Sequence, residues 1–395
     1  MKILYISYDG LMEPLGQSQV LAYQEKLARD HDIHIISFEK KEDLANITSL
    51  EAAKSRVAKA GIHWHYLKYH RRLSIFATAY DLMIGFFLSL WICLRFKIQI
   101  IHARSYVPSV IAIGIKKLIT VKFIFDMRGF WADEKVDGGS WDKKSHIYSL
   151  TKKFEKLFLL QSDHIVSLTH AGIKEISKFP YIKSDSLNFT VIPTCADLNL
   201  FQNYHLQKDG LTIGYVGSAG LWYNFSATLK AFSLILEVKP NAKLLIINRN
   251  EHDFIKDSIR STNLSWENIS LFSSSLEEIP HFMNQMHAGI FFINPLFSKQ
   301  ASAPTKLGEF LGCGVPCLSN HHVGDMAGIL ETNNCGVAIK TFSENEIKSG
   351  VERLLSLISQ AEVPRKCTQT AKQYFSLERG VNLYSNVYNK FDITI

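Results

Sequence analysis

The chain has 395 residues, which is more than one ordinary hydrophobic core holds, so we expect two domains. A hydrophobic content of 47% and a charged content of 21% are typical of a globular protein. The net charge of +7 is mild and spread along the chain. It is compatible with an anionic ligand or a membrane surface, but it is too diffuse to indicate a nucleic-acid-binding protein.

The cysteines indicate free thiols rather than a zinc site. The six cysteines form no CxxC pair and show no paired histidine spacing, and most of them lie in apolar runs. This usage is typical of buried thiols in a reducing compartment, so we expect a cytoplasmic protein. A predicted strand follows Met1 at once, so no secretory signal is expected. The longest apolar run, residues 82–94, is shorter than a membrane-spanning helix.

Residues 1–200 are predicted to form a first α/β domain with a doubly wound parallel sheet. Its predicted strands occupy residues 2–8, 32–38, 62–67, 98–102, 122–125, 164–168 and 189–193. Predicted helices alternate with them at residues 19–29, 42–60, 73–95 and 143–161. Four polar side chains follow two successive strands, namely His102, Arg104, Asp126 and Arg128. Because parallel strands end at one edge of a sheet, we expect these side chains at the rim where ligands bind.

The apolar helix predicted at residues 73–95 has two interpretations. It follows the basic residues Lys68, Arg71 and Arg72, and it carries several large aromatic side chains. A basic start beside an aromatic, apolar helix is typical of a segment lying on a bilayer surface, with weak and salt-sensitive attachment. The helix is also apolar on nearly all sides, which is typical of a buried core helix. We favour the core helix and keep the membrane surface open as a partner.

Residues 201–375 are predicted to form a second domain of the same kind. Its strands are expected at residues 211–216, 243–247, 269–272, 288–294, 315–318 and 337–340. Gly217 and Ser218 follow the first of these strands, and Arg249 follows the second, so all three belong to the rim. Residues 376–395 are expected to form a C-terminal helix that packs back on the first domain.

The stretch at residues 297–319 predicts an anion site. Ser302 followed by Pro304 is typical of a helix start, with Ser302 as the N-cap. The free N–H groups at such a start attract anions, and Lys306 adds a full positive charge in the first turn. Glu309, one turn further on, can accept hydrogen bonds from sugar hydroxyls. The combination indicates a nucleotide or nucleotide-sugar site.

A metal site is not indicated. Asp30 and Asp32 form the literal pattern Asp-x-Asp, but they lie between a predicted helix and a strand, on the wrong side of the sheet. We interpret this pattern as a solvated turn. The loop after the first strand contains Gly10 and Gly16 but lacks the GxGxxG pattern of dinucleotide-binding proteins.

Three motifs carry a resemblance to a known family. They are YDGLMEPLGQSQV at residues 8–20, DMRGFWADE at residues 126–134 and SAPTKLGEFLGCGVP at residues 302–316. With them the chain resembles the retaining glycosyltransferases of family 4, in the branch of bacterial surface-polysaccharide synthesis. The resemblance covers nearly the whole chain. It implies the GT-B fold, in which two Rossmann-like domains face each other across a ligand-binding cleft.

The resemblance implies roles in the second domain. Glu309 matches the acidic residue that binds the donor ribose, and the amides near Pro304, Thr305 and Lys306 would hold the diphosphate. The family's other acidic residue falls on Ala301, so its contact to the transferred sugar is missing, and Gln300 or Ser302 would substitute. The family's Arg and Lys after the first strand are also missing. Ser218 and the Leu-Trp-Tyr segment 221–223 stand there instead, and Lys306 with Arg249 would supply the charge.

In the first domain, Gly16 matches the glycine that lets the backbone approach the donor phosphates. A histidine common in the family is replaced by Asp126, and Asp126 with Arg128 would contact the acceptor or the sugar. The resemblance implies sugar transfer from a nucleoside diphosphate sugar to a hydroxyl with retention. No cofactor and no metal are expected. The acceptor would be a sugar or lipid-linked saccharide at the inner face of the cytoplasmic membrane.

Two alternatives remain open. One is a nucleotide-sugar epimerase on the same architecture, which would need an acid/base pair that the sequence does not clearly provide. The other is a non-catalytic glycosyltransferase-like subunit, which the loss of the carboxylate at Ala301 and of the family's Arg and Lys favours. Retention of Lys306, Glu309 and the whole rim of the first domain speaks against that subunit.

Overall fold

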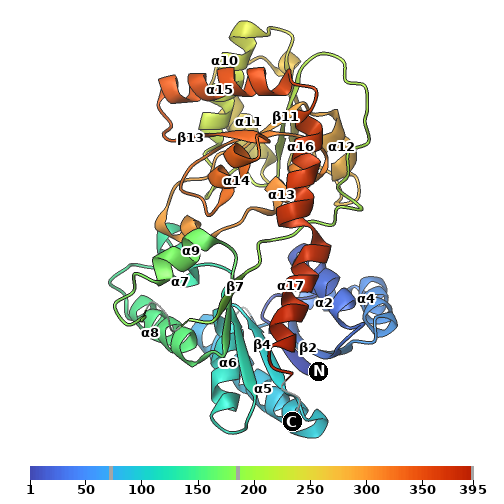
Figure 1. The fold of residues 1–395 in the computed structure, drawn as a ribbon, viewed down its shortest axis with the longest axis vertical. Coiled ribbons are helices and arrows are strands. Elements are labelled where there is room, and N and C mark those ends of the chain that lie inside the picture. Colours follow the sequence, from blue (N-terminus) through green and yellow to red (C-terminus); the bar gives the residue numbers. More distant parts are fainter. Residues whose placement is uncertain (71–73, 184–186, 393–395) are drawn as a thin grey trace. The chain divides into compact units, whose positions relative to one another are not determined.

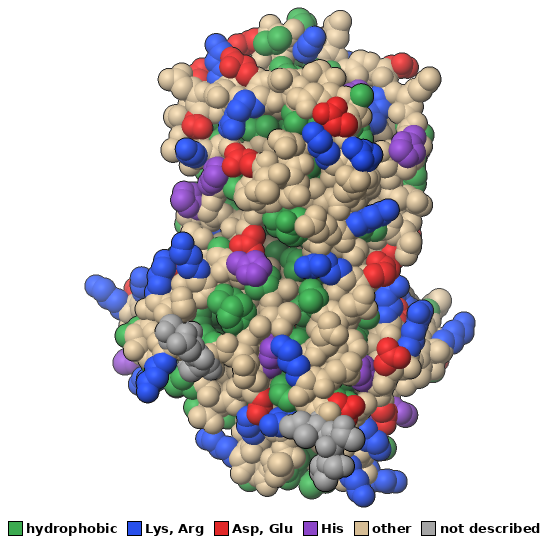
Figure 2. Space-filling view, in the orientation of Figure 1, with side chains coloured by type: hydrophobic (Ala, Val, Ile, Leu, Met, Phe, Trp, Pro, Cys, Tyr) green, Lys and Arg blue, Asp and Glu red, His purple; other side chains and the backbone are tan. Residues whose placement is uncertain are grey.

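A computed structural model gives the structure, and it describes residues 1–70, 74–183 and 187–392. The chain divides into two compact units. The first unit comprises Met1–Pro193 and Gly380–Ile395, and the second comprises Thr194–Arg379. Lys and Arg side chains are scattered over the visible face among acidic and neutral ones, as the diffuse charge of the sequence predicts (Figure 2).

The described part of the first unit contains a seven-stranded, wholly parallel sheet in the order β3-β2-β1-β4-β5-β6-β7. The strands are β1 (Lys2–Ser7), β2 (Asp32–Glu39), β3 (His63–Lys68), β4 (Ile100–Arg104), β5 (Lys122–Asp126), β6 (His164–Ser167) and β7 (Phe189–Val191). The central strands are buried on both faces, which accounts for their almost continuous apolar sequences. The strand order reverses between β1 and β4, and this switch point is where open α/β sheets bind ligands.

Helices cover both faces of this sheet, with α6 and α8 on one side and α2, α4 and α17 on the other (Figure 1). The helical segments are α1 (Pro14–Gly16), η1 (Gln17–Leu21), α2 (Ala22–Leu27), α3 (Lys41–Ala45), α4 (Ile47–Lys59), α5 (Ser74–Phe96), α6 (Tyr106–Lys116), α7 (Trp131–Asp137), α8 (His146–Gln161), α9 (His170–Ile176) and α17 (Leu377–Asn389). The part of α17 from Gly380 onward belongs to the first unit.

The second unit repeats this plan over its described residues, with a six-stranded parallel sheet in the order β10-β9-β8-β11-β12-β13. The strands are β8 (Thr212–Val216), β9 (Lys243–Ile247), β10 (Ile269–Phe272), β11 (Ala288–Ile290), β12 (Cys317–Asn320) and β13 (Gly336–Ile339). The helical segments are α10 (Phe225–Val238), α11 (His252–Arg260), η2 (Trp266–Asn268), α12 (Ile279–Gln285), η3 (Phe297–Ala301), α13 (Thr305–Gly312), α14 (Met326–Thr332), α15 (Glu344–Ile358), α16 (Val363–Thr370) and η4 (Ala371–Phe375). Its switch point lies between β8 and β11.

The predicted fold class, two doubly wound α/β domains, is confirmed. The six cysteines are buried and free, as predicted. Two details of the prediction are wrong. The strand expected at residues 288–294 ends at Ile290, because the chain beyond it turns toward the loop after β8, where Ile293 forms an isolated bridge with Tyr223. The segment after β4, where no helix was predicted, is the helix α6, which begins at Tyr106.

The helix α5 differs from the buried core helix that we favoured. Its buried positions include the small residues Ala77, Gly85 and Ser89, and a Cβ atom on Gly85 would lie 2.8 Å from Ile111 of α6. Six of its large apolar side chains are instead 47–78% exposed, namely Phe76, Tyr80, Met83, Phe87, Trp91 and Leu94. Spacings of three and four residues place these six on one face of the helix, here called the α5 stripe.

Within the described residues, segment Phe76–Phe96 is the helix that is long and apolar enough to cross a membrane, by length and composition alone. A third of its most apolar window, 33%, is buried. The expectation that no segment reaches the length of a span is therefore wrong, because the helix continues beyond the apolar run at both ends. Lys68 is exposed at the end of β3. Arg71 and Arg72, the other members of the predicted basic start, lie outside the described residues.

Candidate functional site

The candidate site lies at the switch point of the second sheet. Gly217 follows β8 directly, with a φ of +95°, and its N–H donates to the carbonyl of Ile247 at 2.9 Å. A Cβ atom on Gly217 would lie 3.1 Å from the Nζ atom of Lys306, in the first turn of α13. Both the turn and the neighbouring ammonium group therefore require a glycine here.

Pro304 holds the N-cap position of α13, and no side-chain hydrogen bond caps the helix in this structure. The prediction of Ser302 as the N-cap is therefore wrong. Ser302 instead ends η3, where its N–H donates to the carbonyl of Lys299 at 3.2 Å. The first N–H groups of α13, including those of Thr305 and Lys306, have no partner within the helix and remain available to an anion.

Lys306 places a buried ammonium group at this point. The residue is 7% exposed, and its Nζ atom has no hydrogen-bond partner in the structure. The Nζ atom lies 3.9 Å from the ring centroid of Tyr223, 5.1 Å from that of Tyr215 and 5.4 Å from that of Phe291. Three aromatic faces from β8, its loop and the chain after β11 thus surround the cation. An unpaired buried charge is costly, so this arrangement indicates a site for an anionic ligand.

Glu309 lies one turn further along α13. Its side chain is partly exposed and makes no hydrogen bond or ion pair to a described residue. Burial raises the pKa of Glu309 to about 7, against the attraction of Lys306. Burial likewise lowers the pKa of Lys306 to about 7, against the attraction of Glu309. Because the Glu309 side chain makes no hydrogen bond to a described residue, its oxygens are free to accept hydrogen bonds from a ligand beside the Lys306 ammonium group.

Glu251 fixes the loop after β8, and sequence reasoning missed this role. Its Oε2 atom accepts from the N–H of Ala219 at 2.8 Å, and its Oε1 atom accepts from the N–H of Gly220 at 3.1 Å. Burial raises the pKa of this carboxyl, but the amide of Ala219 and the side chain of Asn248 outweigh that effect and lower it. The position after β9, on the rim, is the signal that would have suggested Glu251.

The two remaining rim residues are exposed. Ser218 lies in the same loop, and its carbonyl accepts from the hydroxyl of Tyr215 at 2.6 Å. Arg249 lies exposed after β9, the strand next to β8. The two residues thus share the carboxyl edge with Lys306, and no contact of either side chain with Lys306 occurs in the described chain.

A second lysine, Lys299, was also missed. Its Nζ atom lies 3.7 Å from the ring centroid of Trp222, and the residue is buried. Trp222 and Tyr223, at the positions where the resemblance led us to expect Arg and Lys, each lie under a lysine ammonium group from residues 297–306. The positive charge is therefore present at this edge, but another segment supplies it. Ala301, between the two lysines, is buried and offers no polar group.

The first unit joins Asp126 and Arg128, but within an internal network. Asp126 is buried at the end of β5, where its Oδ2 atom accepts from the Tyr384 hydroxyl at 2.9 Å and contacts His102 Nε2 at 3.4 Å. The Arg128 guanidinium lies 4.0 Å from the Oδ1 atom. Burial raises the pKa of Asp126, but Arg128 and His102 outweigh that effect and lower it. The partner from α17, Tyr384, could not be inferred from sequence because it lies 258 residues away.

Gly16 also has an internal explanation. A Cβ atom at this buried position would lie 1.9 Å from the carbonyl oxygen of Gly10, so two parts of the loop after β1 meet there. On the same rim, Arg104 is buried, with an ion pair to Asp9 at 3.4 Å, and its Nε and Nη1 atoms have no hydrogen-bond partner among the described residues. The roles predicted for Gly16, Asp126 and Arg128 stay predictions.

A hollow of about 870 Å³ in the second unit lies away from Lys306. Its lining includes Gly314, which precedes β12, and Lys208, Arg365 and Lys372. It therefore opens at the amino edge of the sheet, whereas ligands of such folds bind at the carboxyl edge.

Comparison with known families gives one match. Residues 198–374 match the family described as "Glycosyl transferases group 1". The matched segment contains every site residue of the second unit, including Gly217, Lys299, Lys306 and Glu309. No curated protein sequence matches the chain.

Solved structures match over nearly the full chain. Sucrose-phosphate synthase from Thermosynechococcus elongatus has a TM-score of 0.75 at 13% identity, covering 99% of this chain and 98% of its own. A glycosyltransferase from Rickettsia africae has a TM-score of 0.71 at 14% identity, with coverages of 100% and 99%. The Anabaena protein HepE in complex with UDP-glucose has a TM-score of 0.69 at 11% identity, with coverages of 99% and 100%. These likenesses show that the chain has the fold of these proteins.

Proposed function

We propose that the protein is a retaining glycosyltransferase that moves a sugar from a nucleoside diphosphate sugar to a hydroxyl group. The observation that carries this proposal is the buried, unpartnered ammonium group of Lys306 at the start of α13. The match of residues 198–374 to a glycosyltransferase family supports it. The structures of HepE with UDP and with UDP-glucose support a nucleotide-sugar donor.

The second unit would bind the donor. The N–H groups of Thr305 and Lys306 would hold the diphosphate, with the Lys306 ammonium group against its non-bridging oxygens. Gly217 would leave room for the diphosphate beside Lys306, because it has no side chain. Glu309 would accept hydrogen bonds from the ribose hydroxyls.

The reaction requires charge stabilisation above all. The bond from the anomeric carbon to the diphosphate oxygen breaks, and a bond from that carbon to the acceptor oxygen forms on the same face. The hydroxyl proton passes to the departing diphosphate, whose negative charge grows in the transition state. The preorganised N–H groups of α13 and the ammonium of Lys306 would stabilise that charge. Because these groups supply the positive charge, we expect turnover without a divalent cation.

We further propose that the acceptor is a sugar or lipid-linked saccharide of a cell-surface polysaccharide or glycolipid, met at the cytoplasmic face of the membrane. The α5 stripe supports this part. A helix with small residues against the protein and large aromatic residues outward resembles a helix that lies in a membrane interface. The buried carboxyl of Asp81, which accepts from the Tyr8 hydroxyl at 2.9 Å, shows that the opposite face is anchored in the protein.

A screen of nucleoside diphosphates and their sugars by thermal shift tests the donor. A ligand at a hundredfold its dissociation constant adds about 2.7 kcal/mol to the free energy of unfolding, which is readily measured. We expect the nucleoside diphosphate and nucleotide sugar of one base to raise the melting temperature of the wild type. The same ligands should raise the melting temperature of Lys306→Met much less. If no nucleoside diphosphate or its sugar raises the melting temperature of the wild type, the donor assignment is wrong.

One observation favours a second candidate, a non-catalytic glycosyltransferase-like subunit. The position of the family's first acidic residue is the buried Ala301, which cannot contact the sugar through a polar group. Such a subunit would bind the nucleoside diphosphate but would neither transfer nor hydrolyse the sugar. Release of nucleoside diphosphate from the donor, with water or a crude glycolipid extract as acceptor, separates the two candidates.

A further inference from the structure

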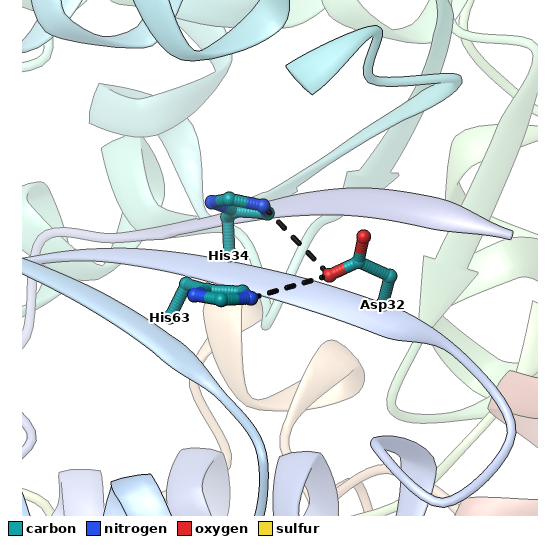
Figure 3. Close-up of side chains that lie close together, drawn as sticks. All are labelled: Asp32, His34 and His63. Atoms are coloured by element: carbon teal, nitrogen blue, oxygen red, sulfur yellow. Dashed lines mark ion pairs between the residues drawn. The ribbon is translucent and has the colours of Figure 1, made fainter. Parts of the chain in front are cut away.

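A cluster of metal-ligating side chains lies in the first unit, at the opposite edge of the sheet from the rim residues of that unit. Asp32, His34 and His63 stand at the amino ends of β2 and β3, whereas the rim residues of the first unit stand at the carboxyl ends (Figure 3). The parallel register pairs His34 with His63, and Asp32 is two residues before His34 on the same face of β2. The sheet register thus brings together residues that are distant in the sequence.

The ligand atoms of the three side chains converge. The Asp32 Oδ1 atom lies 3.8 Å from the His34 Nε2 atom and 3.6 Å from the His63 Nε2 atom. All three atoms lie within 4.8 Å of one another. A tetrahedral metal with bonds of about 2.0–2.1 Å holds its ligands about 3.4 Å apart, so small movements close this set around one ion.

His34 is prepared as a metal ligand. Its side chain is fully buried, and its Nε2 atom, which faces the cluster, has no hydrogen-bond partner. Its other ring nitrogen, Nδ1, lies 3.2 Å from the Nε2 atom of His65. A proton on Nδ1 donated to His65 leaves the Nε2 lone pair directed at the cluster, as the outer hydrogen bond of metal-bound histidines does.

We propose that Asp32, His34 and His63 bind one divalent transition-metal ion of the zinc type, with two imidazole nitrogens and one carboxylate oxygen. This donor set suits zinc and its neighbours, which favour imidazole, and a water molecule completes the coordination. The His34 and His63 rings are stacked at 4.5 Å with an interplanar angle of 22°. Closure around the ion therefore tilts the His63 ring, whose side chain is 57% exposed and has room to move.

The metal would stabilise the fold of the first unit and would take no part in the proposed reaction. It would tie β2 to β3, and it would also fix the end of α5, because Phe96 packs on His34 with ring centroids 4.4 Å apart. The Lys2 ammonium group, 3.9 Å from the Oδ2 atom of Asp32, contacts the oxygen that the metal does not use. Loss of the ion should therefore lower the stability of the first unit and leave the donor site intact.

Calorimetric titration of the full chain with zinc chloride, after treatment with a chelator, tests the proposal. We expect one zinc ion per chain in the wild type and at least tenfold weaker binding in Asp32→Asn and in His63→Ala. The altered side chains are 57% exposed for His63 and 39% exposed for Asp32, so both variants should fold. His146→Ala, which removes an exposed histidine of the same unit outside the cluster, is the matched control and should bind as the wild type does.

Cobalt(II) provides a second readout on the same variants. Coordination by two imidazoles and a carboxylate should give visible absorption bands in the wild type and in His146→Ala but not in His63→Ala. Stoichiometric binding that is equal in wild type and His63→Ala would overturn the proposal, as would the absence of stoichiometric zinc binding. In either case Asp32, His34 and His63 would not form a metal site.

Discussion

Lys306 is the residue on which the proposed chemistry depends most. It is buried among three aromatic rings without a hydrogen-bond partner, which is unfavourable unless an anion joins it. Lys306→Met should therefore lower turnover by about 10²–10³-fold, the usual loss when one preorganised charge-stabilising group is removed. The Michaelis constant for the donor should rise much less, because the charge on the diphosphate grows in the transition state. Steady-state kinetics distinguish this outcome from a change in the Michaelis constant alone, which would show that Lys306 only binds.

The same substitution should stabilise the protein in the absence of ligand. Replacing a poorly solvated charge by an apolar side chain of similar length typically adds about 1–4 kcal/mol to the free energy of unfolding. The pKa of Lys306 is lowered to about 7 in the folded state, whereas the unfolded chain holds this proton up to about pH 10.5. The protonated lysine therefore lowers the free energy of unfolding. The cost is fully present below pH 7 and declines as the pH rises toward 10.5.

Urea denaturation of wild type and Lys306→Met at pH 6.5 and pH 9 measures that pH dependence. The difference in unfolding free energy should be larger at pH 6.5. A difference that grows toward pH 9 would mean that the ammonium group is not the source of the cost.

Glu309 provides the matching test for the ribose. If its carboxylate accepts hydrogen bonds from the ribose hydroxyls, Glu309→Ala should weaken binding of the nucleoside diphosphate by about 1.5–3 kcal/mol. Glu352→Ala removes an exposed glutamate of α15 and serves as the control. Calorimetry gives both affinities, and equal binding by a folded Glu309→Ala protein would remove Glu309 from the site.

Some site residues could be predicted from the sequence and others could not. Lys306 and Glu309 are signalled by a short motif at a helix start, where position in the sequence fixes position in space. Lys299 was missed because its role depends on the loop of a neighbouring strand, and no local pattern signals such a contact. The contacts of Glu251 also lie in a neighbouring loop, and its position after β9 indicated only that it belongs to the rim. The metal cluster was missed because His34 and His63 meet only through the register of two parallel strands.

At the scale of elements, α5 makes the clearest prediction. Wild-type protein should co-sediment with anionic vesicles, and the double change Phe87→Ser with Trp91→Ser should weaken binding by about 1.5–3 kcal/mol for each side chain. Leu118→Ser, which alters an exposed apolar residue away from the α5 stripe, is the control. Basic residues such as Lys68 add a salt-sensitive part, and the stripe adds a part that persists at high salt. If the wild type ignores such vesicles at low and high salt, the stripe is not a membrane surface.

The elements themselves were largely predictable, because apolar runs and their periodicity reflect burial in a parallel sheet. The orientation of α5 was not, since the whole helix is apolar and only its packing partner decides which face is covered. The partner, α6, starts shortly after β4, where no helix was predicted. The small residues Ala77, Gly85 and Ser89 along one face were the available signal. The N-cap of α13 was misplaced because Ser302 is the C-cap of η3 and the helix begins only after Pro304, two residues further on.

At the scale of the whole molecule, the two α/β units have separate tasks in the proposed function. The second unit holds the donor, and the first unit carries the α5 stripe and the proposed metal cluster. Chelation should therefore lower the melting temperature of the protein by several degrees but leave its turnover at moderate temperature unchanged. Differential scanning calorimetry and a transfer assay on the same chelated sample measure both quantities. Loss of turnover that magnesium or manganese restores would instead place a catalytic metal at the donor site.

The most direct test of the central claim is calorimetric titration of wild type and Lys306→Met with nucleoside diphosphates. We expect one nucleoside diphosphate to bind the wild type with one site per chain, and Lys306→Met to bind it at least tenfold more weakly. A wild type that binds none of them, or a variant that binds equally well, would contradict a nucleotide-sugar site at the start of α13.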